Sequence, residues 1–318
     1  MRETKRISAY IRMAFELFLV VGIVSGHVLF SQSLDIPSKK WGLSIGNSKE
    51  FTGLRFNFRD SRVRRITGVN FTIWMPRQDN KDAVVRGLSL GLAPGGGELQ
   101  GIQLGLLGVS ADKSMTGLNI GGLGLGAGDY LTGINIGGLG VGAGADMTGL
   151  AIGGLGVGAG ENVTGLCIGG LGVGAGGNLK GLCIGGLGVG AGGDFTGIAV
   201  AGLGAGAGGR LTGIAVCGLG AGASDMRGLV VGGLGAGGRH LKGVFLGGLM
   251  IRVEKGGRLS GLAASSFNCV RGTLTGLAIG IVNYAWNLDK GIQIGLINIV
   301  RDNPKGLKVL PVFNADFK

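Results

Sequence analysis

The stretch LTGINIGGLGVGAGAD, residues 131–146, decides the fold, because Met147 begins the same arrangement again. The unit has 16 residues: an apolar run of six, two spacer residues, a second run of six and two more spacers. Further units open at Val163, Leu179, Phe195 and Leu211. Two-residue spacers such as Gly-Gly between short apolar runs are typical of tight hairpin turns. The repeat therefore predicts an all-β protein in which each unit forms one antiparallel hairpin of about 16 residues.

The hairpin interpretation fixes which residues face each other. Ile152 would oppose Leu155, and Leu150 would oppose Val157. Opposed residues share a face of the sheet, so Leu, Ile and Val gather on one side and glycine on the other. We expect the hairpins to form a meander that closes into a shallow barrel, because closure removes the open edges. The apolar face would then point inward.

A parallel β-solenoid with one coil per unit is the alternative fold. In a solenoid, Leu150 would stack on Leu166 instead of facing Val157. Connections of two residues are too short to bridge two sheets packed about 10 Å apart, and this favours the hairpins.

The repeat extends beyond its most regular part. A core of Gly, apolar, any residue, apolar begins at Gly53, Gly68, Gly87, Gly101 and Gly117, and it returns at Gly228, Gly243, Gly261, Gly276, Gly291 and Gly306. We therefore expect one glycine-rich repeat domain over residues 51–318, after a linker over residues 34–50.

The amino terminus resembles a targeting segment. Basic residues precede an apolar run from Met13 to Phe30, and small residues follow it. This pattern predicts a signal peptide or an N-terminal anchor helix over residues 1–33. The protein would be exported to the cell envelope, at the outer membrane or cell surface of a Gram-negative-type bacterium.

Composition excludes several classes of protein. Glycine accounts for 74 of 318 residues, but with five prolines and no three-residue period the chain is not collagen. A hydrophobic fraction of 45% against 15% charged residues argues against disorder. The net charge of +12 favours an anionic partner. Aromatic residues are too few to predict nucleic-acid binding.

Catalytic patterns were not found in the sequence. His27 lies in the targeting segment and His240 in an expected turn, and no cluster has the spacing of metal ligands. We expect no enzyme activity, no cofactor and no small-molecule substrate. Cys167 and Cys183 take equivalent places in successive hairpins, so an intervening strand would keep their backbones about 9–10 Å apart and prevent a disulfide.

Several stretches resemble a known group. The repeated units, together with GIQIGLINIVRDNP at 291–304 and LPVFN at 310–314, resemble glycine-rich surface-repeat proteins of Bacteroidota-type bacteria. These are similar in turn to the β-flower group, shallow barrels of hairpin petals that have been compared with Tubby-like and scramblase-type barrels at lipid surfaces. The resemblance covers about residues 50–314. It implies lipid association, but it offers no catalytic or binding residues to carry over.

The functional hypothesis is a non-enzymatic envelope protein that associates with membrane lipid. The residues expected to form the apolar lipid-contacting face are Ile134, Ile136, Leu139, Val141, Leu150, Ile152, Leu155, Val157, Leu166, Ile168, Leu171 and Val173. The residues expected to form a basic rim facing headgroups are Lys180, Arg210, Arg227, Arg239 and Lys242. A surface adhesin built as a ligand-binding solenoid is the main alternative, and an outer-membrane channel is a second.

Overall fold

The computed structural model describes residues 33–316 and is all-β, with 76% of these residues in strands. The strands form a parallel β-solenoid. The chain divides after Asp112 into two compact units. Apart from Ser33, the segment expected as a signal peptide or anchor helix lies outside the described residues.

Unit 1 begins with an antiparallel pair and continues in parallel. The segment expected as a linker, residues 34–50, contains most of β1 and all of β2, which pair antiparallel. From β2 onward each strand pairs in parallel with the next as far as β6. The elements are β1 (Ser33–Pro37), β2 (Trp41–Gly46), β3 (Glu50–Arg59), β4 (Arg65–Trp74), the 3-10 helix η1 (Gln78–Asn80), β5 (Val84–Gly91) and β6 (Gly95–Gly105).

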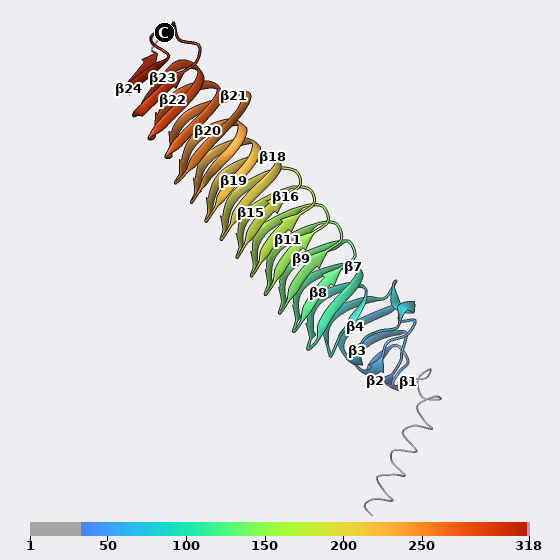
Figure 1. Ribbon diagram of the computed structural model, residues 1–318. Coiled ribbons are helices and arrows are strands. Elements are labelled where there is room, and N and C mark those ends of the chain that lie inside the picture. Colours follow the sequence, from blue (N-terminus) through green and yellow to red (C-terminus); the bar gives the residue numbers. More distant parts are fainter. Residues whose placement is uncertain (1–32, 317–318) are drawn as a thin grey trace, which may run out of the picture. The chain divides into compact units, whose positions relative to one another are not determined.

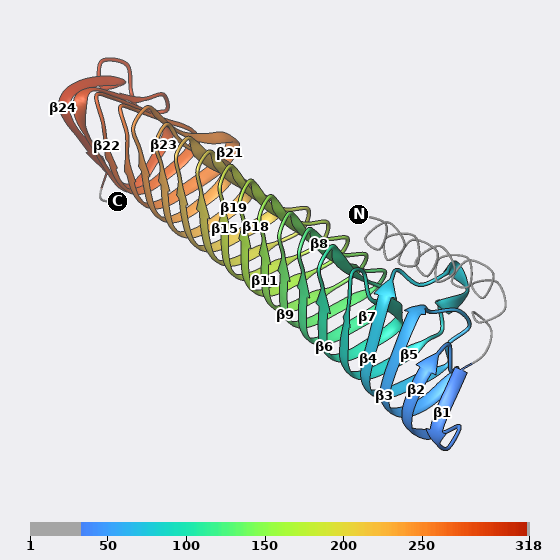
Figure 2. The ribbon, with the colours of Figure 1, turned by 90° about the horizontal axis from the view of Figure 1, so that it is seen from below.

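Unit 2 contains the regular coils, each with one long and one short strand. Figures 1 and 2 show its long strands side by side, each one coil further along. The central strands are β7 (Gly108–Gly121), which begins in unit 1, β8 (Gly124–Ala127), β9 (Tyr130–Gly137), β10 (Gly140–Ala143), β11 (Met147–Gly153), β12 (Gly156–Ala159), β13 (Val163–Gly169), β14 (Gly172–Ala175), β15 (Leu179–Gly185), β16 (Gly188–Ala191) and β17 (Phe195–Ala201). In the later coils the short strand runs into the next long one, which gives β18 (Gly204–Cys217), β19 (Gly220–Gly232), β20 (Gly235–Gly247), β21 (Met250–Ala264), β22 (Phe267–Ile279) and β23 (Val282–Val300). The antiparallel strand β24 (Val309–Asp316) ends the sheet.

The expected antiparallel barrel is wrong, and the solenoid alternative is correct. Long strand β11 pairs in parallel with β13, with Leu150 beside Leu166, and short strand β12 pairs in parallel with β14. The expectation from turn length is wrong because the two sheets converge at the corner. A Cβ added to Gly153, at the end of long strand β11, would lie 3.3 Å from the backbone nitrogen of Val141 in short strand β10, so strands of the two sheets touch there. Two residues therefore suffice to pass from one sheet to the other.

The expected division into an apolar face and a glycine face is also wrong. Side chains alternate along the long strand, so Met147 and Ala151 point inward while Leu150 and Ile152 point outward. Val157 enters the same interior from the short strand and is 4% exposed. Each coil thus has a narrow core of small and medium side chains, and its leucines and isoleucines lie outside.

One glycine ladder sets the path of the long strands. In unit 2 its members run from Gly117 to Gly276, one in each coil, with φ between +108° and +136°. At Gly165 an added Cβ would overlap the carbonyl oxygen of Gly149 in the preceding coil. Only glycine tolerates both this backbone and this contact. The recurring Gly, apolar, any, apolar core therefore marks one place in each coil.

The expected separation of Cys167 and Cys183 is wrong as well. They are direct partners in the parallel register, and both are buried in the coil interior. All four cysteines are free thiols. Hydrogen bonding with Cys167, and then burial, raise the pKa of the Cys183 thiol above its usual range. The ladder continues through Ala151 and Ala199, so a small side chain is what this position requires.

Candidate functional site

Outward apolar side chains form three ladders along unit 2. Eleven successive parallel pairings align the long strands from β7 to β23, so equivalent residues stack coil on coil. The first ladder is Leu118, Ile134, Leu150, Leu166, Leu182, Ile198, Ile214, Leu229, Val244, Leu262, Leu277 and Ile292. The second ladder is Ile120, Ile136, Ile152, Ile168, Ile184, Val200, Val216, Val231, Leu246, Ala264, Ile279 and Ile294. The corner ladder follows the Gly-Gly turns as Leu123, Leu139, Leu155, Leu171, Leu187, Leu203, Leu219, Leu234 and Leu249.

These apolar ladders form an unusually large exposed apolar surface. Leu155 and Leu171 are each 50% exposed. Strands lie about 4.8 Å apart and rise about 3.3 Å per residue, so the ladders cover a strip about 50 Å long and 15 Å wide. An area on the order of 700 Å² exceeds the largest apolar patch of most soluble monomers. Such a face is a candidate site for contact with a protein, a membrane or a ligand.

Unit 1 repeats the same outward pattern with aromatic residues. Phe56 and Phe71 occupy neighbouring positions in β3 and β4, and their ring centroids lie 5.6 Å apart. Both rings are 40% exposed or more. The outward apolar side chains are therefore a property of the repeat, not of one group of coils.

Basic side chains border the first ladder on the same sheet face. Lys180, Arg227 and Lys242 take the position that Thr148 and Thr164 hold in earlier coils, two residues before the first ladder. Arg227 and Lys242 are direct register partners, and all three basic side chains are exposed. They lie near the start of the long-strand segment of each coil. Positive charge thus runs beside the apolar strip.

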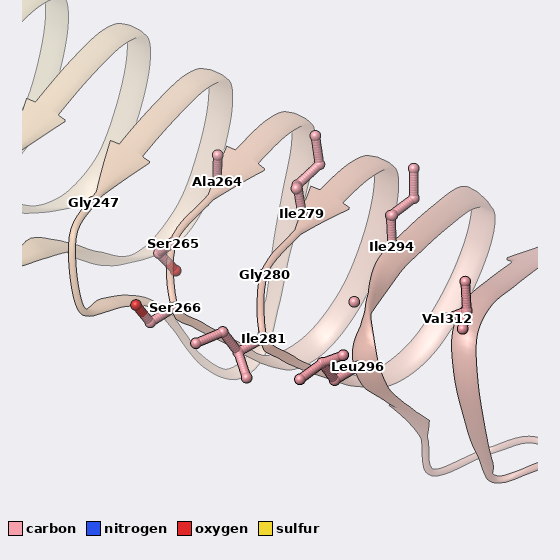
Figure 3. A pocket seen from close by; sticks show the side chains of 11 residues that line it. Gly247, Ala264, Ser265, Ser266, Ile279, Gly280, Ile281, Ile294, Leu296 and Val312 are labelled. Carbon is pink, nitrogen blue, oxygen red and sulfur yellow. The ribbon is translucent and has the colours of Figure 1, made fainter.

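A groove opens between the second ladder and the corner at the end of unit 2. It has a volume of about 640 Å³. Figure 3 shows Ile279 and Ile294 on one side and Ile281 and Leu296 on the other, with Gly280 between them. Val312 of β24 lines the groove as well. The lining is aliphatic except for two serines at the corner, and this suits a hydrocarbon chain.

A buried asparagine ladder shapes this groove. Asn268 donates to the side-chain oxygen of Asn283 at 2.8 Å, and Asn283 donates to that of Asn298 at 2.8 Å. The same amides donate to the carbonyl oxygens of Ile279 and Ile294, which line the groove. The asparagines thus satisfy carbonyl groups where the corner departs from the Gly-Gly-Leu sequence.

The structure separates the residues predicted for the apolar face. Nine of them lie on the apolar ladders: Ile134, Ile136, Leu139, Leu150, Ile152, Leu155, Leu166, Ile168 and Leu171. Val141, Val157 and Val173 lie inside the coils, each 4% exposed or less, so they cannot contact an external partner. Sequence reasoning missed the C-terminal groove, for which the break in the Gly-Gly-Leu corner at Ser265 and Ser266 was the available signal.

A second polar cluster in unit 1 is structural. Arg55 is fully buried, and its guanidinium contacts Asp60 at 2.7 Å and Asn70 at 2.8 Å. Asp60 also accepts from Asn57 and Thr72. The charged groups satisfy one another, so the cluster offers no open position for a ligand.

Within residues 33–316 no helix could cross a bilayer, and no group of His, Cys, Asp and Glu side chains could hold a metal ion. The chain matches no protein-family model, no curated protein and no solved structure. The features of the described residues that bear on function are therefore the apolar surface and the groove.

Proposed function

We propose that this chain is a non-enzymatic protein of the cell envelope that binds along a lipid surface through its apolar ladders. The observation that supports this proposal best is the strip of outward leucines and isoleucines on unit 2, whose corner ladder is about half exposed. The basic side chains beside the strip suit anionic headgroups, each contributing about 1 kcal/mol near a charged bilayer. A lipid phase covers both the apolar strip and this basic border.

The corner ladder offers the sharpest mutational test. Replacing Leu155, Leu171 and Leu187 by serine removes three side chains that are about half exposed. Covering each half-exposed leucine with hydrocarbon is worth about 2 kcal/mol, so the triple variant should bind vesicles about 100-fold more weakly or worse. Full-length protein is floated with vesicles of phosphatidylcholine and phosphatidylglycerol. The folded solenoid should persist, because these side chains are outside the core.

A matched control places three serines on the opposite face of the same coils. An added Cβ meets nothing within 4 Å at Gly174 and Gly190, and only a distant carbonyl at Gly158. Serine at these three positions should leave vesicle binding unchanged. Equal binding by both triple variants would contradict the proposal, as would association of the native protein only with itself.

Fluorescent labels determine which face meets lipid even if residues 1–32 also bind membrane. A nitrobenzoxadiazole label is attached to Leu155→Cys or to Gly158→Cys, while the four native cysteines are buried and protected. On vesicles the emission from position 155 should shift to the blue, and that from 158 should not. A shift at both positions or at neither refutes the assignment of this face.

A further inference from the structure

A second hollow lies on the outward face of the short strands in the last coils of unit 2. It has a volume of about 420 Å³. Three aromatic side chains line it, Phe267, Tyr284 and Trp286, together with three cations, Lys255, Arg271 and Arg301. In the central coils the corresponding outward positions of the short strands are glycines such as Gly172 and Gly174. The sequence thus replaces bare backbone with aromatic and basic groups in these coils.

The cations converge on the hollow without a carboxylate in its lining. The guanidinium carbon of Arg301 lies 4.5 Å from the centroid of the Trp286 ring. Val270 pairs with Ala285, so the next residues, Arg271 and Trp286, belong to neighbouring coils. Backbone hydrogen bonds from residues 301 and 302 to Ala285 and Trp286 hold Arg301 in the following coil. The rigid sheet therefore presents guanidinium groups from coils on both sides of one indole ring.

This chemistry selects a ring that carries negative charge. Guanidinium groups bind carboxylate and phosphate with two parallel hydrogen bonds. Aromatic faces supply apolar contact to a flat ring in a shallow, open site. The volume is in the range of small-ligand sites and accommodates one or two sugar rings.

The hollow adjoins the aliphatic groove described above. Ser266 lines the groove, and the next residue, Phe267, lines the aromatic hollow. Likewise Ile281 lines the groove, and Tyr284 follows three residues later on the short-strand face. One amphiphile can therefore place a hydrocarbon chain on one side of this corner and its headgroup on the other.

We infer that the last coils bind an anionic glycolipid, an acylated sugar that carries a carboxylate or a phosphate. The acyl chain lies in the groove between Ile279 and Ile281, and the charged ring lies against Trp286 with Arg271 and Arg301. The inference rests on the proposed function and names the class of lipid.

Trp286 fluorescence measures binding directly once the two other tryptophans are removed. Full-length protein carrying Trp41→Phe and Trp74→Phe is titrated with dodecyl glucuronide below its micelle concentration. Three further probes each lack one part of this ligand. Dodecyl glucoside has the chain and the ring but no charge, dodecyl phosphate has the chain and the charge but no ring, and free glucuronate has the charged ring but no chain. We expect dodecyl glucuronide to bind at least about tenfold more tightly than each of the other three probes.

Charge-removing variants separate the pocket from general electrostatics. Arg271→Gln with Arg301→Gln should remove the preference for dodecyl glucuronide over dodecyl glucoside. Arg65→Gln with Arg86→Gln removes the same charge from exposed positions in unit 1 and should keep the preference. Circular dichroism confirms that both variants are folded.

Three outcomes overturn the inference. The first two are equal binding of the charged and neutral glycosides and an unchanged preference in the Arg271 and Arg301 variant. The third is binding of uridine monophosphate as tight as that of dodecyl glucuronide, which would indicate a nucleotide site. These outcomes leave the vesicle results intact. Conversely, dodecyl glucuronide could bind specifically while the leucine and glycine triple variants bind vesicles equally. That result would refute only the broader proposal of binding along a lipid surface.

Discussion

Two glycines nine residues apart should respond in opposite ways to the same substitution. Gly165 has φ +132°, and a Cβ there would overlap the carbonyl oxygen of Gly149. Gly174 has no atom within 4 Å of an added Cβ and lies in the extended strand β14. Gly165→Ala should therefore be strongly destabilising, and Gly174→Ala should be neutral or stabilising.

The magnitudes follow from the two environments. Alanine in a backbone region reserved for glycine costs about 1–3 kcal/mol. The overlap also forces neighbouring coils apart and weakens one or two hydrogen bonds, at about 1 kcal/mol each. Gly165→Ala should thus lose about 2–5 kcal/mol. Gly174→Ala should gain about 0.4–1 kcal/mol, because alanine reduces the entropy of the unfolded chain.

Urea unfolding followed by circular dichroism measures both variants against the native protein. In the antiparallel interpretation, both glycines would lie on one open glycine face and would respond alike. Equal unfolding midpoints for the two variants would therefore refute the reasoning from the coil geometry.

Three further predictions concern the interior. Asp60→Ala leaves the buried Arg55 without its carboxylate and should cost about 3–5 kcal/mol, whereas Glu50→Ala, at the exposed ion pair with Arg64, should cost less than about 1 kcal/mol in the same urea titration. Asn283→Ala removes three side-chain hydrogen bonds of the buried ladder and should lower stability by about 1–3 kcal/mol, with loss of amide-exchange protection confined to the last coils if the reasoning holds. The pKa of Cys183 is raised in the folded protein, so the contribution of this thiol to stability is complete below about pH 8.5 and is lost as the pH rises and the unfolded thiol ionises. Between about pH 8 and 10, Cys183→Ala should therefore lose less stability than the native protein does. Identical pH profiles of stability for the two proteins would contradict this cause.

Periodicity alone gave the all-β class, the 16-residue unit and the equivalent positions in each unit. Every core glycine from Gly117 to Gly276 occupies the same place in its coil. Strand direction did not follow, because Gly-Gly spacers suit both a hairpin turn and a narrow solenoid corner. The deciding contact, Gly153 against Val141 of the preceding coil, depends on how closely two sheets approach, and no local propensity encodes it.

The candidate surface was predicted in part for the same reason. Leu150, Ile152 and Leu155 were assigned to an apolar face, and they are together on the outside of the coil. Val157 was placed with them because the hairpin register opposed it to Leu150. In a solenoid the alternation restarts after the corner and turns Val157 inward. The aromatic hollow at Trp286 joins residues from four coils, so only the coil stacking brings them together.

The distance between residues 148 and 212 tests the parallel solenoid most directly. Thr148, Thr164, Lys180, Thr196 and Thr212 are successive register partners on one outer ladder. Nitroxide labels are attached to Thr148→Cys and Thr212→Cys in a chain whose four native cysteines are alanine, and their separation is measured by pulsed electron paramagnetic resonance. Four coil spacings predict a separation of about 19 Å. A separation of about 38 Å, as eight strands of an antiparallel meander require, would contradict the account.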